Sequence, residues 1–76
     1  SNSKARVLSE LAASLSETKH FMQAEEIANS IEDTHDKASA LNKLAANLWK
    51  VDPTKAKELF SQAEEIANSI EDRFSK

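Results

Sequence analysis

Apolar residues recur at intervals of three and four positions through most of the chain, which is the spacing of one face of an α-helix. Four such stripes are separated by polar breaks. They run through Leu8-Leu11-Ala12-Leu15, Phe21-Ala24-Ile27-Ala28-Ile31, Leu41-Leu44-Ala45-Leu48 and Ala56-Leu59-Phe60-Ala63-Ile66-Ala67-Ile70, the last extending to Phe74. The stripes predict four helices, over about residues 3–17, 19–32, 35–50 and 53–73, and no β-strand.

The breaks between the stripes carry helix-start signals. Asp52-Pro53 suits the start of the fourth helix, because Asp is a good N-cap and Pro is tolerated at the first helical position. Thr18 is the expected cap of the second helix, and Asp33 or Thr34 that of the third. Connections this short make consecutive helices antiparallel neighbours.

The chain repeats itself. The eleven residues QAEEIANSIED occupy positions 23–33 and again 62–72, and the preceding stripe from Leu8 matches the one from Leu41. The stripes are offset by 33 residues and the eleven-residue segments by 39, so the second repeat contains six extra residues. We expect these to lengthen both helices of the second hairpin by about three residues each.

Repeats of this length are typical of stacked supersecondary units. The predicted fold is therefore all-α: two tandem antiparallel helix hairpins, stacked as a fragment of an α-solenoid, in which the copied segments occupy equivalent environments. Residues 1–76 would form a single repeat domain, with repeat 1 at about 3–34 and repeat 2 at about 35–74.

Composition agrees with this prediction and narrows the classes of partner. The 76 residues include no glycine, one proline and no cysteine, which disfavours tight β-turns and excludes disulfides. The net charge of −3 argues against a nucleic-acid partner, and no apolar run approaches the ~20 residues that span a membrane. Without a secretory signal pattern, a cytoplasmic location is expected.

The pattern resembles the tetratricopeptide repeat family. Its large–Leu–small–large order is matched by Leu8-x-x-Leu11-Ala12-x-x-Leu15, and its second-helix spacing by Phe21, Ala24 and Ala28. Repeat 2 has the same residue types, displaced by the insertion, so the resemblance covers nearly the whole chain. Leucine and alanine replace the signature Trp and Gly, and Asp36 replaces the proline.

The resemblance implies a concave groove, lined by the first helix of each hairpin, that binds a peptide of a protein partner. Carried over position by position, its residues are Arg6, Ser9, Ala13, Ser16, Glu17, Ser39, Asn42, Ala46, Trp49 and Lys50. Trp49 leaves two interpretations open, since it could anchor a ligand in the groove or pack against Val51 or Phe60 at the tip of the second hairpin.

The fourth stripe continues beyond the part that a hairpin partner can cover. Ile66, Ile70 and Phe74 would pack on a third repeat, and burying them is favourable. We therefore expect the chain to be a pair of repeats from a longer array and to form homo-oligomers, by end-to-end stacking, dimerisation or exchange of hairpins.

Candidate chemistry is sparse. His20 and His35 lie in different connections, so neither metal nor cofactor is expected. Adjacent carboxylates such as Glu25-Glu26 point about 100° apart on a helix and do not converge on one atom. The chain is predicted not to be an enzyme. The leading hypothesis is a protein–protein interaction module or repeat scaffold; the alternative is a recently duplicated or designed structural repeat that self-associates without a ligand of its own.

Overall fold

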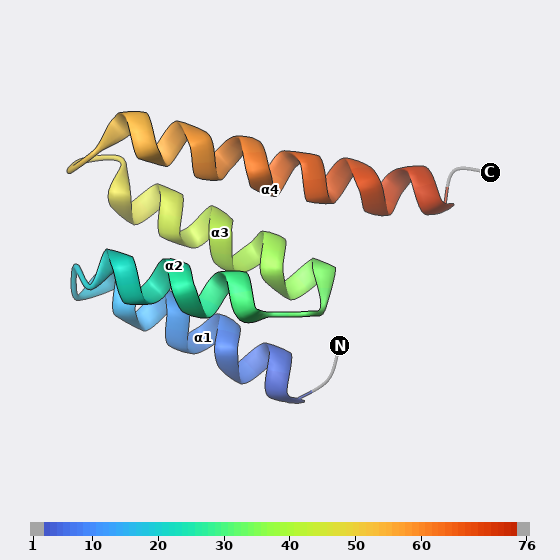
Figure 1. The fold of residues 1–76 in the computed structure, drawn as a ribbon, viewed down its shortest axis with the longest axis horizontal. Helices are drawn as coiled ribbons and strands as arrows, with labels where there is room; N and C mark the ends of the chain where they lie inside the picture. The colour runs from blue at the N-terminus through green and yellow to red at the C-terminus, as the bar shows by residue number, and fades with distance from the viewer. Residues whose placement is uncertain (1–2, 75–76) are drawn as a thin grey trace.

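The computed structural model describes the backbone of residues 3–74 and the side chains of residues 3–70. It contains α1 (Ser3–Glu17), α2 (Phe21–Ser30), α3 (Thr34–Leu48) and α4 (Pro53–Phe74), and the described backbone includes no strand. Figure 1 shows them as two antiparallel hairpins, α1–α2 and α3–α4, lying side by side. The predicted all-α arrangement of stacked hairpins is confirmed.

Helix α3 is the centre of the stack, because it alone packs against all three other helices. It is seated on both helices of the first hairpin and pairs with α4 on its other side. The core follows the predicted stripes on α2, α3 and the first half of α4. Its buried apolar members are Ala5, Ala12, Ala24, Ala28, Ile31, Ala40, Leu41, Leu44, Ala45, Leu48, Ala56, Leu59 and Ala63.

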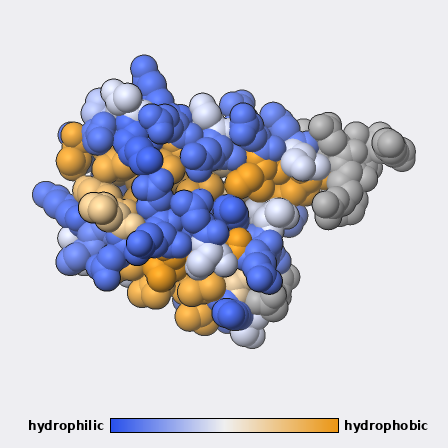
Figure 2. Space-filling model, in the orientation of Figure 1, coloured by the Kyte–Doolittle hydropathy of each residue, from blue (hydrophilic) through white to orange (hydrophobic). Residues whose placement is uncertain are grey.

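The stripe on α1 is only partly buried. Leu11 is 43% exposed, whereas Leu44, its equivalent in the second repeat, is fully buried. The matching stripes of the two repeats are therefore not buried to the same extent. The reason is that α3 has helices on both sides and α1 has them on one. Figure 2 shows the resulting hydrophobic surface along the edge of the molecule formed by α1.

The first hairpin turns without a glycine. The His20 N–H donates to the Leu15 carbonyl at 2.8 Å and the Lys19 N–H to the Ser16 carbonyl at 3.2 Å, which is the Schellman arrangement. Lys19 has φ 68°, a left-handed conformation that usually favours glycine. The expectation that Thr18 caps α2 is wrong. Its hydroxyl donates back to the Leu15 carbonyl at 3.1 Å.

Two other caps follow the sequence signals. The Asp33 carboxylate accepts a hydrogen bond from the Asp36 N–H at 3.1 Å at the start of α3. Asp52 does the same for the Lys55 N–H at 3.1 Å, immediately before Pro53. Of the two candidates for the α3 cap, the structure therefore selects Asp33.

The six extra residues of repeat 2 are not shared between its helices. Helices α1 and α3 both have 15 residues, whereas α2 has 10 and α4 has 22. The insertion therefore lies in the first turns of α4, and the expected even division was wrong. Pro53 explains this, because the residue before a proline is disfavoured in a helix and α3 must stop short of it.

The copied eleven-residue segments begin alike and end differently. In the first copy Ile31 leaves the helix with φ −73° and ψ 125° and buries its side chain, whereas its equivalent Ile70 remains within α4. Ala28 is fully buried, whereas its equivalent Ala67 is exposed. The expectation of equivalent environments is therefore wrong for the second half of the segment. The first copy packs beneath α3, and no described helix takes that place over α4.

Candidate functional site

The predicted groove residues divide by accessibility. Seven are exposed, Ala13 is half-buried, and two are buried because α3 covers their side of α1. The exposed ones are Arg6, Glu17, Ser39, Asn42, Ala46, Trp49 and Lys50. Ser9 and Ser16 are 6% and 1% exposed, so neither can contact a ligand on that surface, and their assignment to the groove was wrong.

Ser16 instead joins the two hairpins. Its hydroxyl donates to the Ala13 carbonyl at 2.7 Å and accepts from the Asn47 side-chain amide at 2.8 Å. The second bond runs from α3 to α1 and fixes how far one helix can slide along the other. Because the hydroxyl is both donor and acceptor, its burial leaves no unmet hydrogen bond.

Trp49 has features of both interpretations. Its ring contacts Phe60 with centroids 6.1 Å apart and planes inclined at 55°, within the usual range for a tilted aromatic pair. It remains 45% exposed. The tryptophan thus packs on the tip of the second hairpin with one side while the other remains open to solvent.

A groove of about 550 Å³ runs between α3 and α4. Small side chains form most of its floor, and polar ones its rim. It is lined by Ala38, Ser39, Asn42, Phe60, Ser61, Ala63, Glu64 and Ala67. Ser39 and Asn42 are the two predicted groove residues that it includes.

The first hairpin contains the same groove already filled. Ala38, Asn42 and Ala67 correspond to Ala5, Ser9 and Ala28 in the sequence alignment, and all three of the latter are buried. The helix that covers them is α3, which packs on both α1 and α2. The molecule thus shows one hairpin groove occupied by an amphipathic helix and a second one open.

A comparison of the chain with protein-family models, curated proteins and solved structures found no match.

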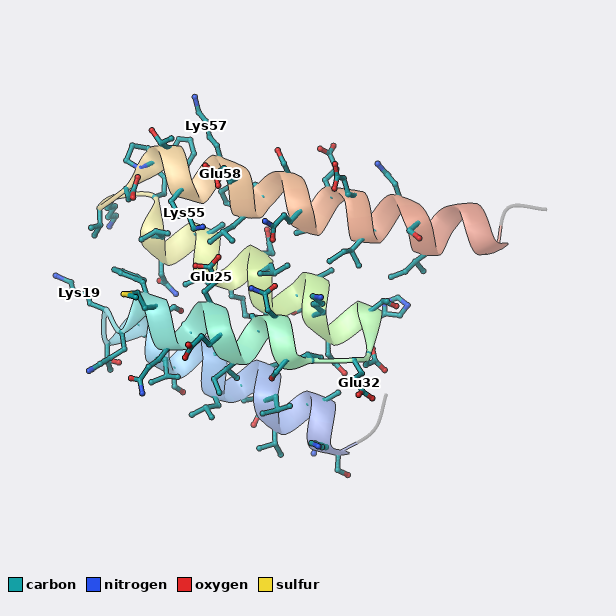
Figure 3. All side chains as sticks on the ribbon, in the orientation of Figure 1. Lys19, Glu25, Glu32, Lys55, Lys57 and Glu58 are labelled. Atoms are coloured by element: carbon teal, nitrogen blue, oxygen red, sulfur yellow. The ribbon has the colours of Figure 1, made fainter. Side chains whose placement is uncertain are left out.

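A second depression, of about 330 Å³, lies between α2 and α4, with Leu44, Leu48 and Leu59 among its lining residues. An ion pair crosses it, with the Lys55 ammonium 3.1 Å from the Glu25 carboxylate (Figure 3). The hydrogen bond and the charge of Glu25 raise the pKa of Lys55 above its usual value of 10.5. The pair links α2 and α4 across α3, so this depression has a structural role.

The titratable groups are dispersed. Among residues 3–70 no three or more His, Cys, Asp or Glu side chains come together as metal ligands would. His20 lies 2.9 Å from the Thr18 hydroxyl at the first turn, and His35 is exposed at the start of α3. No helix within the described part of the chain combines the length and the apolar character needed to cross a bilayer.

The three residues of the predicted self-association face lie on α4. Ile66 and Ile70 are half-buried on α4, and the side chain of Phe74 lies outside the described residues. The sequence prediction missed the alanine floor of the α3/α4 groove, because alanines within an apolar stripe were interpreted as core. A comparison of the two repeats, position by position, could have shown that Ala28 has a covering helix in the chain and Ala67 has none.

Proposed function

We propose that this protein is a non-catalytic protein–protein interaction module, related in plan to tetratricopeptide repeats, that holds an amphipathic helix of its partner between α3 and α4. The observation that carries the proposal is the packing of α3 against both helices of the first hairpin. A groove of the same sequence type already binds a helix within this chain.

The lining of the open groove suits such a ligand. Alanines at positions 38, 63 and 67 allow the backbone of an incoming helix to approach closely, and the exposed Asn42 and Glu64 can hydrogen-bond along its edges. The groove is shallow and lies between two helices, which favours a helix over a compact small molecule.

The ligand pattern can be taken from α3 itself. Its buried side chains include Ala40, Leu44 and Leu48, spaced four residues apart, so they form one stripe on the helix. A partner helix with small or aliphatic residues at this spacing should bind.

The test uses a fluorescein-labelled peptide of residues 33–49, the segment that fills the groove of the first hairpin. Fluorescence anisotropy should show saturable binding to the chain. Ala67→Lys should weaken it at least about tenfold, equivalent to about 1.4 kcal/mol, because the lysine stem occupies the groove. Met22→Lys is the matched control, since Met22 is 84% exposed and does not line this groove.

Failure of the peptide to bind, or equal binding by the Ala67→Lys variant, would remove this site from consideration. A scrambled peptide with the same helical propensity should show no saturable binding.

The eleven-residue identity favours one alternative function. Two copies so alike are typical of a recently duplicated or designed structural repeat, which needs no ligand. On that interpretation the peptide does not bind, and substitutions in the groove change only the free energy of unfolding.

A further inference from the structure

We infer that the α3/α4 groove binds helix α1 of a second copy of this chain, so that copies associate head to tail. This inference rests on the proposed function and names the partner of the same groove. It follows from the contact between the two hairpins within one chain, which the second copy would continue in the same direction.

The groove side of this contact is available. Several buried positions of the first hairpin have a more exposed equivalent on the second: Ala28 is fully buried where Ala67 is exposed, and Ser9 is buried where Asn42 is exposed. Ala63 is retained in the floor, as the equivalent of Ala24. The second hairpin thus presents the surface that already accepts α3.

The helix side is available as well. Val7 and Leu11 on α1 are 58% and 43% exposed, and their equivalents on α3, Ala40 and Leu44, are fully buried. An apolar ridge therefore faces solvent on α1 at the positions that α3 buries within the stack (Figure 2). Burying it against a second copy is favourable in proportion to the apolar area removed from water.

The sequences of α1 and α3 show why α1 matches the groove. Lys4-Ala5-x-x-Leu8-x-x-Leu11 on α1 has the same residues at the same spacing as α3 from Lys37. Helix α1 thus has the apolar residues of a docking helix on a side that no described helix covers. The other candidate ridge, on α4, has Ile66 packed against the core.

The proposed contact between copies differs from the contact between the two hairpins at two positions. Val7 is larger than Ala40, and Trp49 replaces Ser16 at the end of the groove. By the same equivalence Ser14 of the incoming helix would reach Trp49, since Asn47 reaches Ser16 within the chain. The chain has one tryptophan, so its fluorescence reports on this end of the contact.

The contact joins two different surfaces, a groove and a ridge. Such heterologous contacts do not close on themselves unless the rotation between copies brings them into a ring. The expected products are therefore short linear stacks, whose average mass rises with protein concentration.

Sedimentation equilibrium with two variants tests the inference. Leu11→Lys removes the ridge and leaves the groove intact; Ala67→Lys fills the groove and leaves the ridge intact. Both positions are exposed, so both variants should keep the helical circular dichroism of the parent. Both introduce the same charge, so the mutated surfaces do not attract each other.

The parent chain and the Met22→Lys control should increase in mass with concentration, while each blocking variant alone stays monomeric. An equimolar mixture of the two variants should reach twice the mass of one chain and stop there, because one intact groove meets one intact ridge. The Trp49 emission of Leu11→Lys should shift to shorter wavelength in the mixture, since only its groove becomes occupied.

A parent chain that stays monomeric at all concentrations overturns the inference, as does association that survives either blocking variant. A mixture that stays monomeric while the parent associates indicates a symmetric contact and overturns it too. If the peptide of residues 33–49 binds and the chain does not self-associate, the inference alone fails. If neither the peptide nor a second copy binds, the proposed function fails with it.

Discussion

Leu44 and Leu11 occupy the same place in the two repeats and should respond very differently to truncation. Leu44 is fully buried on the central helix, and replacing such a leucine by alanine costs ~2–5 kcal/mol through lost transfer free energy and the residual cavity. Leu11 is 43% exposed, so truncation there should cost about 1 kcal/mol or less. For a chain of 76 residues, a total stability of ~4–11 kcal/mol is typical, so Leu44→Ala removes a large share of it.

Urea unfolding followed by circular dichroism at 222 nm measures both losses, at a concentration where the parent sediments as a monomer. The denaturant dependence should stay unchanged while the midpoint falls far more for Leu44→Ala. In thermal unfolding its midpoint should drop by at least ~8 °C, because each kcal/mol shifts a domain of this size by ~4–8 °C. Equal destabilisation by the two variants would refute the central position of α3 and the open side of α1 together.

Three further predictions concern local contacts. Lys19→Gly should raise the free energy of unfolding by about 0.5–1 kcal/mol, because it relieves the left-handed strain, and Lys19→Ala should not; equal thermal midpoints for the two would contradict this. Ser16→Ala should cost ~1 kcal/mol and couple to Asn47→Ala in a double-mutant cycle, whereas additive losses would show that the bond contributes nothing. The Lys55–Glu25 pair, whose side chains are 37% and 29% exposed, should contribute less than ~1 kcal/mol and weaken in high salt. Because the pKa of Lys55 is raised on folding, that contribution should be complete below pH 10.5 and disappear as the pH rises through the raised value; a cycle with Lys55→Met and Glu25→Gln measured across this range tests it.

The helices and two of their caps could be predicted from sequence because they depend on local chemistry. Spacing of apolar residues identified all four helices, and Asp33 and Asp52 marked two starts from their side chains alone. The turn at Lys19 could not be predicted in this way, since its positive φ is imposed by the hydrogen bonds around it and no glycine marks it.

The accessible surfaces could not be predicted from a stripe alone. Leu11 and Leu44 occupy the same place in matching apolar stripes, and the helices packed on each decide which is buried. The same holds for Ala28 and Ala67 within the copied segments. Identical residues therefore form core in one repeat and a candidate binding surface in the other, and only the three-dimensional arrangement distinguishes them.

Because α3 alone packs against all the other helices, most of the contact between the two hairpins is made by this one helix. Contacts that are close in sequence close small loops, so folding should be rapid and can start in either hairpin. The pairing of α4 with α3 can then open and reclose while the first hairpin stays intact, and amide hydrogens near the two ends of the stack should exchange sooner than those at its middle.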